Sequence, residues 1–99
     1  MIGWMAGSLA GHDKNRIYII IEETNDYVLL CDGDIRLLDC PKRKKRKHIQ
    51  VIKKSMDENL MAVLQERRNG NSTSNPVAIN EMIKRAIKLY KHSLTDSKE

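Results

Sequence analysis

The sequence predicts a mainly β protein with an α-helical extension, and two patterns support this prediction. Up to residue 54, short runs of β-branched and other apolar residues alternate with turn-forming residues, which is typical of short strands. After residue 54 the apolar residues recur three and four positions apart, which indicates amphipathic helices. Five short strands in succession fit a small barrel better than a sandwich. We therefore predict a barrel over residues 1–54 and a helical extension over residues 55–99.

Each strand is assigned from its own apolar run. Glycines interrupt the first run, which indicates a bent or bulged strand, and the last run alternates apolar with polar residues. Between the third and fourth runs, Asp32-Gly33 is a two-residue turn signal and predicts a hairpin. The five runs lie within residues 2–11, 16–21, 27–31, 35–38 and 49–52.

The first predicted helix has clear signals at both ends. Ser55 and Glu58 form a capping box ahead of an apolar stripe, a pattern that marks a helix start. Gly70 ends this helix. Residues 69–75, NGNSTSN, are a linker by composition.

The second predicted helix begins at Asn75-Pro76, a capping residue followed by a proline that suits the first turn. Its apolar residues follow the spacing of one helix face. This stripe either packs on the barrel or on the first helix, or it docks on another protein. It consists of Ile79, Met82, Ile83, Ala86, Ile87 and Tyr90.

The net charge of +5 is concentrated in one segment. Residues 1–41 carry three cations and seven acids, residues 42–54 carry eight cations and no acid, and residues 55–99 carry seven cations and six acids. Such a segment produces a local positive field suited to phosphate, a membrane surface or an acidic protein. Because Pro41 fixes its φ angle and lacks a donor, we expect the run 42–47 to be an extended loop after the fourth strand. Its successive side chains would then point to opposite sides.

No pattern indicates an enzyme, a metal site or a cofactor. Cys31, Cys40, His12 and His48 are too irregularly spaced for zinc, and Cys31 ends an apolar strand, as a small core residue does. Two cysteines without a secretory signal indicate a reducing, cytoplasmic compartment, and no apolar run is long enough for a membrane span. We therefore expect no catalytic residue, metal, cofactor, small-molecule substrate or membrane partner.

Three elements within residues 3–52 resemble a known family. Residues 7–23, GSLAGHDKNRIYIIIEE, are similar to the KOW motif, a strand–loop–strand unit of ribosomal proteins and transcription elongation factors. The following YVLLCDGDIRLLDCPKRKKRKHIQ extends the resemblance to small bacterial KOW-domain proteins similar to large-subunit ribosomal proteins of archaea and eukaryotes. The resemblance implies an SH3-like barrel and a non-enzymatic RNA-binding protein. Its expected partner is ribosomal RNA of the large subunit, with ribosomal proteins as further candidates.

The predicted RNA contacts combine this resemblance with the chemistry of the residues. Gly11 permits positive φ and close backbone approach, and Asn15, where the family has glycine, is the next best tolerated residue there. His12 replaces the family's arginine, which weakens a phosphate contact near neutral pH. Arg36 either pairs with an acid such as Asp34 or faces RNA. The predicted RNA-binding residues are Gly11, His12, Lys14, Asn15, Arg16, Arg36, Lys42, Arg43, Lys44, Lys45, Arg46, Lys47 and His48.

The scarcity of aromatic residues narrows the kind of RNA. Single-strand readers stack bases on aromatic side chains, whereas Tyr18 and Tyr27 lie in predicted strands, where barrel packing explains them. We therefore expect recognition of folded RNA through its backbone and shape. A second hypothesis is a protein–protein adaptor whose basic segment meets an acidic partner on a translation or transcription factor.

Overall fold

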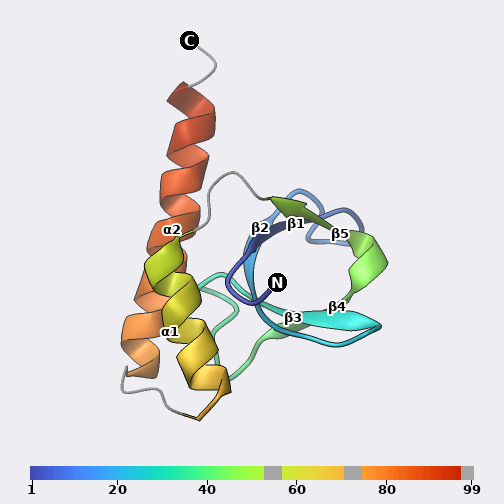
Figure 1. Cartoon of the computed structure of the whole chain (residues 1–99). Coiled ribbons are helices and arrows are strands. Elements are labelled where there is room, and N and C mark those ends of the chain that lie inside the picture. Colours follow the sequence, from blue (N-terminus) through green and yellow to red (C-terminus); the bar gives the residue numbers. More distant parts are fainter. Residues whose placement is uncertain (53–56, 71–74, 97–99) are drawn as a thin grey trace.

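A computed structural model describes residues 1–52, 57–70 and 75–96 of the chain. These residues form a five-stranded antiparallel sheet followed by two helices, so the predicted order of strands and then helices is confirmed, in a fold that mixes the two (Figure 1). The strands are β1 (Met5–Ser8), β2 (Ile17–Glu23), β3 (Tyr27–Cys31), β4 (Lys42–Lys45) and β5 (Ile49–Ile52). A 3₁₀ helix, Arg46–His48, joins β4 to β5, and the two helices are α1 (Glu58–Arg68) and α2 (Pro76–Asp96).

The sheet is curved, and its curvature brings distant segments together. The strands lie in the order β4-β3-β2-β1-β5, so the consecutive strands β4 and β5 form its two edges. Figure 1 shows the strands bending round so that the 3₁₀ helix spans from one edge to the other. A register shift between Ile20 and Glu22 marks a β-bulge in β2, and a bulge bends the strand that carries it. As a result, the loop at residues 9–16, between β1 and β2, contacts β4.

Both faces of the sheet are apolar, which explains the almost unbroken apolar run in β2. On one face, Tyr18 and Ile20 are buried in a cluster of strand residues. On the other face, Ile19 joins a second cluster that the two helices cover. Alternate residues of β2 therefore belong to different clusters, as the pleat of a strand requires.

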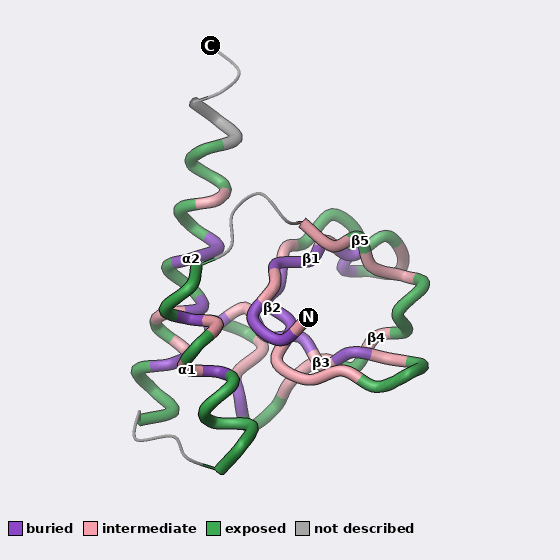
Figure 2. The backbone as a smooth tube through the Cα atoms, in the orientation of Figure 1, coloured by how far each residue is buried: buried purple, intermediate pink, exposed green. Residues whose placement is uncertain are grey.

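The apolar stripe of α2 packs within the protein, so the first of its two predicted alternatives is confirmed. Ile79 and Ile83 are fully buried and share a cluster with Leu60 and Leu64 of α1 and with the sheet. Figure 2 shows the buried stretches of α2 interleaved with exposed ones along its length. Neither helix, over the residues described, is long and apolar enough to cross a membrane.

The observed helix ends match some of the predicted caps and stops. The Asn75 side chain accepts a hydrogen bond from the N–H of Val77 at 2.8 Å, so the predicted cap of α2 is confirmed. The cap of α1 is Asp57, whose carboxylate accepts from the N–H of Leu60 at 3.1 Å. Ser55, part of the predicted capping box, and residues 71–74 of the predicted linker lie outside the described residues. Gly70 follows the end of α1 with φ of +79°, as expected for a helix stop.

The fourth strand lies elsewhere than predicted. Residues 35–38 form no strand, and β4 instead occupies the basic run itself, pairing antiparallel with β3 from Leu30 opposite Lys42 to Tyr27 opposite Lys45. The predictions of a hairpin at Asp32-Gly33 and of an extended loop at 42–47 are therefore wrong. Lysine is common on edge strands because its charge prevents pairing with another sheet edge, so a cationic strand is physically sound at this position.

Residues 32–36 form a turn that docks on α2. Gly33 has φ of +77°, and a Cβ at this position would lie 2.2 Å from the carbonyl oxygen of Asn80 in α2. Only glycine allows so close an approach. The side chain of Asn80 accepts a second contact, from the N–H of Leu38 at 3.1 Å. The segment is thus fixed on α2 at two points, on either side of the exposed Ile35.

Candidate nucleic-acid interface

The basic run is divided into two sets of cations because β4 sends its side chains to two sides. Lys42 and Lys44, the inner cations, are partly buried and face the 9–16 loop, whereas Arg43 and Lys45 are exposed. This alternation follows from strand geometry and confirms the expectation that successive cations point to opposite sides.

The inner cations surround Asp13, of which only 6% is exposed. Lys44 Nζ lies 2.5 Å from Oδ1 of this carboxylate, and Lys42 Nζ lies 3.1 Å from Oδ2. Ser8 of β1 donates to Oδ1 at 3.0 Å, and the Tyr18 hydroxyl of β2 donates to Oδ2 at 3.3 Å. Burial of an ionised carboxylate is unfavourable unless charged and hydrogen-bonding partners compensate for it. Asp13 has both, and through them it links β1, β2 and β4.

These contacts also set the ionisation of Asp13. Burial alone would raise the pKa of its carboxyl, but the hydrogen bonds from Lys44, Lys42 and Ser8 outweigh burial and hold that pKa well below its usual range. Asp13 is therefore ionised at neutral pH. Burial and the negative charge of Asp13 raise the pKa of Tyr18, so the phenol keeps the proton that it donates.

The backbone of the 9–16 loop places Asp13 in this position. Gly11 and Asn15 have φ of 86° and 73°, so the expected tolerance of Asn15 for positive φ is confirmed. The N–H of Asn15 donates to the Ser8 carbonyl at 2.9 Å. Lys44 Nζ also donates to the carbonyl of Ala10 at 2.7 Å. The Lys44 side chain therefore joins β4 to the loop through a backbone carbonyl as well as through the Asp13 carboxylate.

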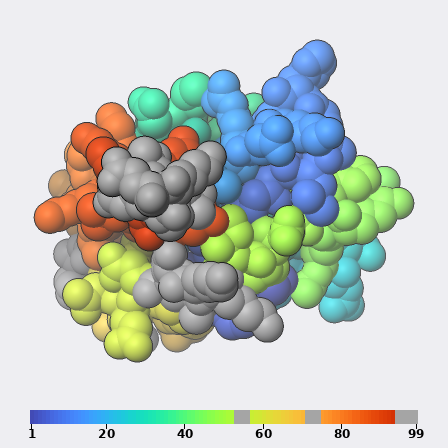
Figure 3. All heavy atoms as spheres, turned by 90° about the horizontal axis from the view of Figure 1, so that it is seen from above, coloured from blue at the N-terminus to red at the C-terminus, as the bar shows by residue number. Residues whose placement is uncertain are grey.

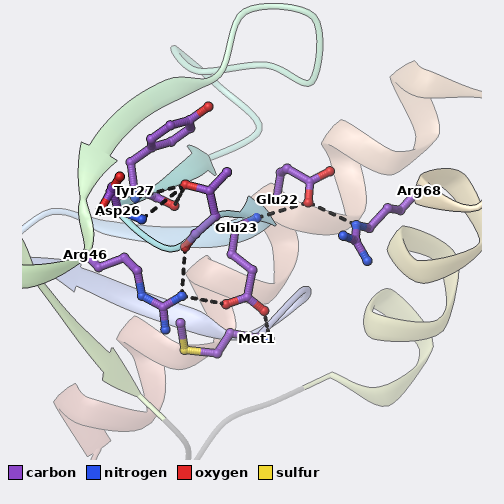
Figure 4. Close-up of polar contacts among 8 residues, drawn as sticks. Met1, Glu22, Glu23, Asp26, Tyr27, Arg46 and Arg68 are labelled. Atoms are coloured by element: carbon purple, nitrogen blue, oxygen red, sulfur yellow. Dashed lines mark hydrogen bonds and ion pairs between the residues drawn. The ribbon is translucent and has the colours of Figure 1, made fainter.

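Arg46, in the 3₁₀ helix, also has a contact within the fold. Its guanidinium lies 3.2 Å from a carboxylate oxygen of Glu23 and donates to the carbonyl of Thr24 at 2.9 Å (Figure 4). The N-terminal amino group donates a hydrogen bond to the other carboxylate oxygen of Glu23 at 2.6 Å. This bond is the main cause of the lowered pKa of Glu23. The neighbouring Glu22 points the other way, toward α1, where its carboxylate lies 2.9 Å from Nε of Arg68.

An open pocket of about 750 Å³ is lined by Arg43, Lys45 and Lys47, which we call the outer cations. The guanidinium of Arg43 lies 4.3 Å from the ring centroid of Tyr27, a cation–π contact that orients it. Lys45 and Lys47 are exposed, and neither has an ion-pair partner among the residues that the structure describes. The pocket is lined by Asn25, Asp26, Tyr27, Arg43, Lys45, Arg46 and Lys47.

The other predicted residues do not share this pocket. No ion pair joins Arg36 to Asp34 in the described part of the chain. Gly11, Lys14 and Asn15 are exposed on the 9–16 loop, and His48 is half-buried at the end of the 3₁₀ helix. A separate pocket of about 280 Å³ beside Asp13 is lined in part by His12, Arg16, Arg36 and Lys42. The predicted residues therefore form two groups rather than one surface.

Sequence reasoning missed three residues of this region as site residues: Asp13, Glu23 and Tyr27. A signal was available for Asp13, the only acid among the first 21 residues and one that lies in a loop next to a strand. No comparable signal pairs Glu23 with Arg46, 23 positions away, or places Arg43 over Tyr27. The contact of Arg43 with Tyr27 depends on the register between β3 and β4, and that of Glu23 with Arg46 depends also on the register between β2 and β3.

Within the described ranges, no three His, Cys, Asp or Glu side chains come together as a possible metal site. Burial raises the pKa of Cys31 to about 12, and its Sγ donates to the carbonyl of Leu37 at 3.3 Å. A buried thiol of this kind is unreactive.

Comparisons of the chain with protein-family models and with curated proteins found no match.

Replacing Asp13 with Asn should destabilise the protein by about 3–5 kcal/mol at neutral pH, because Lys42 and Lys44 lose their counter-charge. The pKa of Asp13 lies below its ordinary value of 3.8 in the folded state. Its stabilising effect is therefore complete above about pH 5 and declines as the pH falls toward the folded pKa. The difference between wild type and Asp13→Asn should shrink accordingly in acid.

Urea unfolding at neutral pH and at about pH 3 measures this difference. Asp39→Asn is the matched control, because Asp39 is exposed, and it should change stability by less than about 0.5 kcal/mol. A loss for Asp13→Asn that is no larger than that of the control would contradict the structural role of the carboxylate.

Proposed function

We propose that this protein is a non-enzymatic RNA-binding protein that holds folded RNA against the outer end of β4 and the 3₁₀ helix. The observation that carries the proposal is the pair of exposed cations Lys45 and Lys47, which have no ion-pair partner among the described residues and lie beside Arg43 and Arg46 in one open pocket. Among the residues that line this pocket the acid is Asp26. Four cations and one acid produce a positive field that suits phosphate groups.

The RNA would be recognised through its backbone. The Tyr18 ring is buried and its hydroxyl is bonded to Asp13, while the ring of Tyr27 lies beneath Arg43. The Tyr18 ring therefore offers no face for base stacking, and Arg43 occupies one face of the Tyr27 ring, whereas single-strand readers stack bases on open aromatic rings. Contacts with phosphates carry no base information, so shape and charge would determine the choice of RNA.

The proposed family is the small KOW-domain proteins with an SH3-like barrel. Support comes from the antiparallel strand order, from the 3₁₀ connection between β4 and β5, and from the positive φ angles of Gly11 and Asn15 in the KOW-like turn. The resemblance then implies ribosomal RNA of the large subunit as the partner and ribosomal proteins as neighbours. The proposal also includes a cytoplasmic location, which the two free cysteines favour.

The number of phosphate contacts can be estimated from the pairing of the cations. Lys42, Lys44 and Arg46 have acidic partners, whereas Arg43, Lys45 and Lys47 have none among the described residues. Three phosphate contacts predict that the logarithm of the binding constant falls with the logarithm of the salt concentration at a slope of roughly −2 to −3. Contacts from all six cations would give a slope about twice as steep.

Changing Lys45 and Lys47 together to Glu should weaken binding to a duplex RNA hairpin of about 16 base pairs by at least ~30-fold at ~0.1 M salt. Two lost phosphate contacts should also make the salt slope shallower by roughly 1.5. The melting temperature should hardly change, because both side chains are exposed. Fluorescence anisotropy over a series of salt concentrations measures the affinity and the slope.

The control is the double change Arg67→Glu and Arg85→Glu, which alters the net charge equally at two exposed positions on the helices. We expect it to leave the salt slope within about 0.5 of the wild-type value. If the control weakened binding as much as the Lys45 and Lys47 changes, only the net charge would matter and the proposed site would be wrong.

The ribosomal partner is tested by sedimentation of the tagged protein from a cell lysate on sucrose gradients at low and high salt. We expect it to migrate with the large subunit at low salt and to leave it as the salt concentration rises. Ribonuclease treatment should release it as well. A complex that persists after this treatment would favour the adaptor hypothesis. If the protein stayed in the light fractions at both salt concentrations, the ribosome would be excluded as its partner.

A further inference from the structure

A third pocket shares no residue with the proposed RNA pocket and has a different chemistry, although it shares Arg16, Asp32 and Ile35 with the pocket beside Asp13. It has a volume of about 330 Å³ and lies between α2, the 32–36 turn and the start of β2. Figure 3 shows α2 (orange), the turn (turquoise) and the 9–16 region (blue) next to one another on this face. We call this pocket the α2 groove.

The lining of the α2 groove includes three isoleucines. Ile17 is partly buried, Ile87 is 6% exposed, and Ile35 is 65% exposed. The exposure of Ile35 does not come from a loose loop, because the turn is fixed on α2 through the close contact of Gly33. The Asp32 carboxylate also accepts from the N–H of Asp34 at 2.9 Å and from that of Arg36 at 2.8 Å. A large apolar side chain is therefore held in solvent on a preformed surface.

The lining of the α2 groove is also charged, with more cations than acids. Arg16 comes from the 9–16 loop, Lys84 and Lys88 lie one helical turn apart on α2, and the acids are Asp32 and Asp34 of the turn. All three cations are exposed, and none has an ion-pair partner among the described residues. A lining that combines isoleucines with an excess of cations is complementary to a peptide that carries both apolar and acidic side chains.

RNA fits the α2 groove less well than such a peptide. The phosphate groups of RNA offer no apolar side chain that could cover the exposed Ile35. An acidic peptide can place its apolar side chains against Ile35 and Ile87 and direct its carboxylates toward the lysines. The two pockets therefore differ in the partner that they suit.

We propose that the α2 groove is a docking site for an acidic, leucine-containing segment of another protein, separate from the RNA surface. This inference does not rest on RNA binding. It gives the protein two binding faces, so that one partner protein and one RNA are held at the same time.

The probe is a labelled peptide of sequence Glu-Asp-Leu-Leu-Asp-Glu, titrated to about 1 mM, the range of weak peptide contacts. Amide NMR should show shifts at Ile35 and at 84–88, and not at 43–47. Replacing both leucines with Ser, or the acids with Lys, should weaken the peptide at least fivefold.

Protein variants separate the two faces. Ile35→Ser, at an exposed position, and Lys84→Glu with Lys88→Glu should each weaken the peptide at least fivefold and leave the affinity for the RNA hairpin within twofold. The pair Lys45→Glu and Lys47→Glu should do the reverse, so failure of the RNA proposal can be told apart from failure of this one.

Several results would overturn the proposal. Peptide shifts confined to 43–47 would mean that the acids merely imitate phosphate. Wild-type peptide affinity in Ile35→Ser would show that the peptide does not contact Ile35. No binding of the peptide up to the highest concentration would contradict the docking site itself. Shifts at 84–88 caused by the RNA hairpin and not by the peptide would assign the groove to RNA.

Discussion

The buried carboxylate of Asp13 is the contact on which the arrangement of this protein depends. It lies in the loop between β1 and β2, receives hydrogen bonds from Ser8 and Tyr18, and pairs with two lysines of β4, a strand that pairs with neither β1 nor β2. A single acid thus holds the curved sheet at the point where the edge strand meets the loop. Its partners keep it ionised, and it in turn neutralises part of a strongly repulsive segment.

This contact gives neighbouring residues of the basic run different roles. Inner side chains stabilise the fold, and outer ones remain available for a partner, because the strand alternates its side chains between two sides. An estimate from net charge alone would therefore overstate the affinity of the basic run for a polyanion. Elsewhere, the turn at 32–36 is fixed on α2 and presents Ile35 in a groove that cations of α2 also line. The proposed RNA surface and the proposed peptide groove therefore differ in chemistry as well as in position.

Local patterns predicted much of the fold. The β-branched run of β2, the run of β3 and the apolar stripe of α2 each carry their own period, so their positions followed from the sequence. The fourth strand did not, because four consecutive cations have low strand propensity, and pairing with β3 and Asp13 overrides it. The sequence predicted which segment carries the candidate site, but not which of its cations are available to a partner. Which lysines are free depends on contacts such as that between Lys44 and Asp13, 31 positions apart, and spacing does not report such contacts.

The division of the basic run is tested most directly by comparing two adjacent lysines. Lys44→Gln removes a contact of 2.5 Å with Asp13, whereas Lys45→Gln removes an exposed charge without an acidic partner among the described residues. In urea unfolding at neutral pH, Lys44→Gln should lose about 2–3 kcal/mol, and Lys45→Gln less than about 0.5 kcal/mol. Equal losses in the two variants would contradict the account, because the run would then act as one undivided surface.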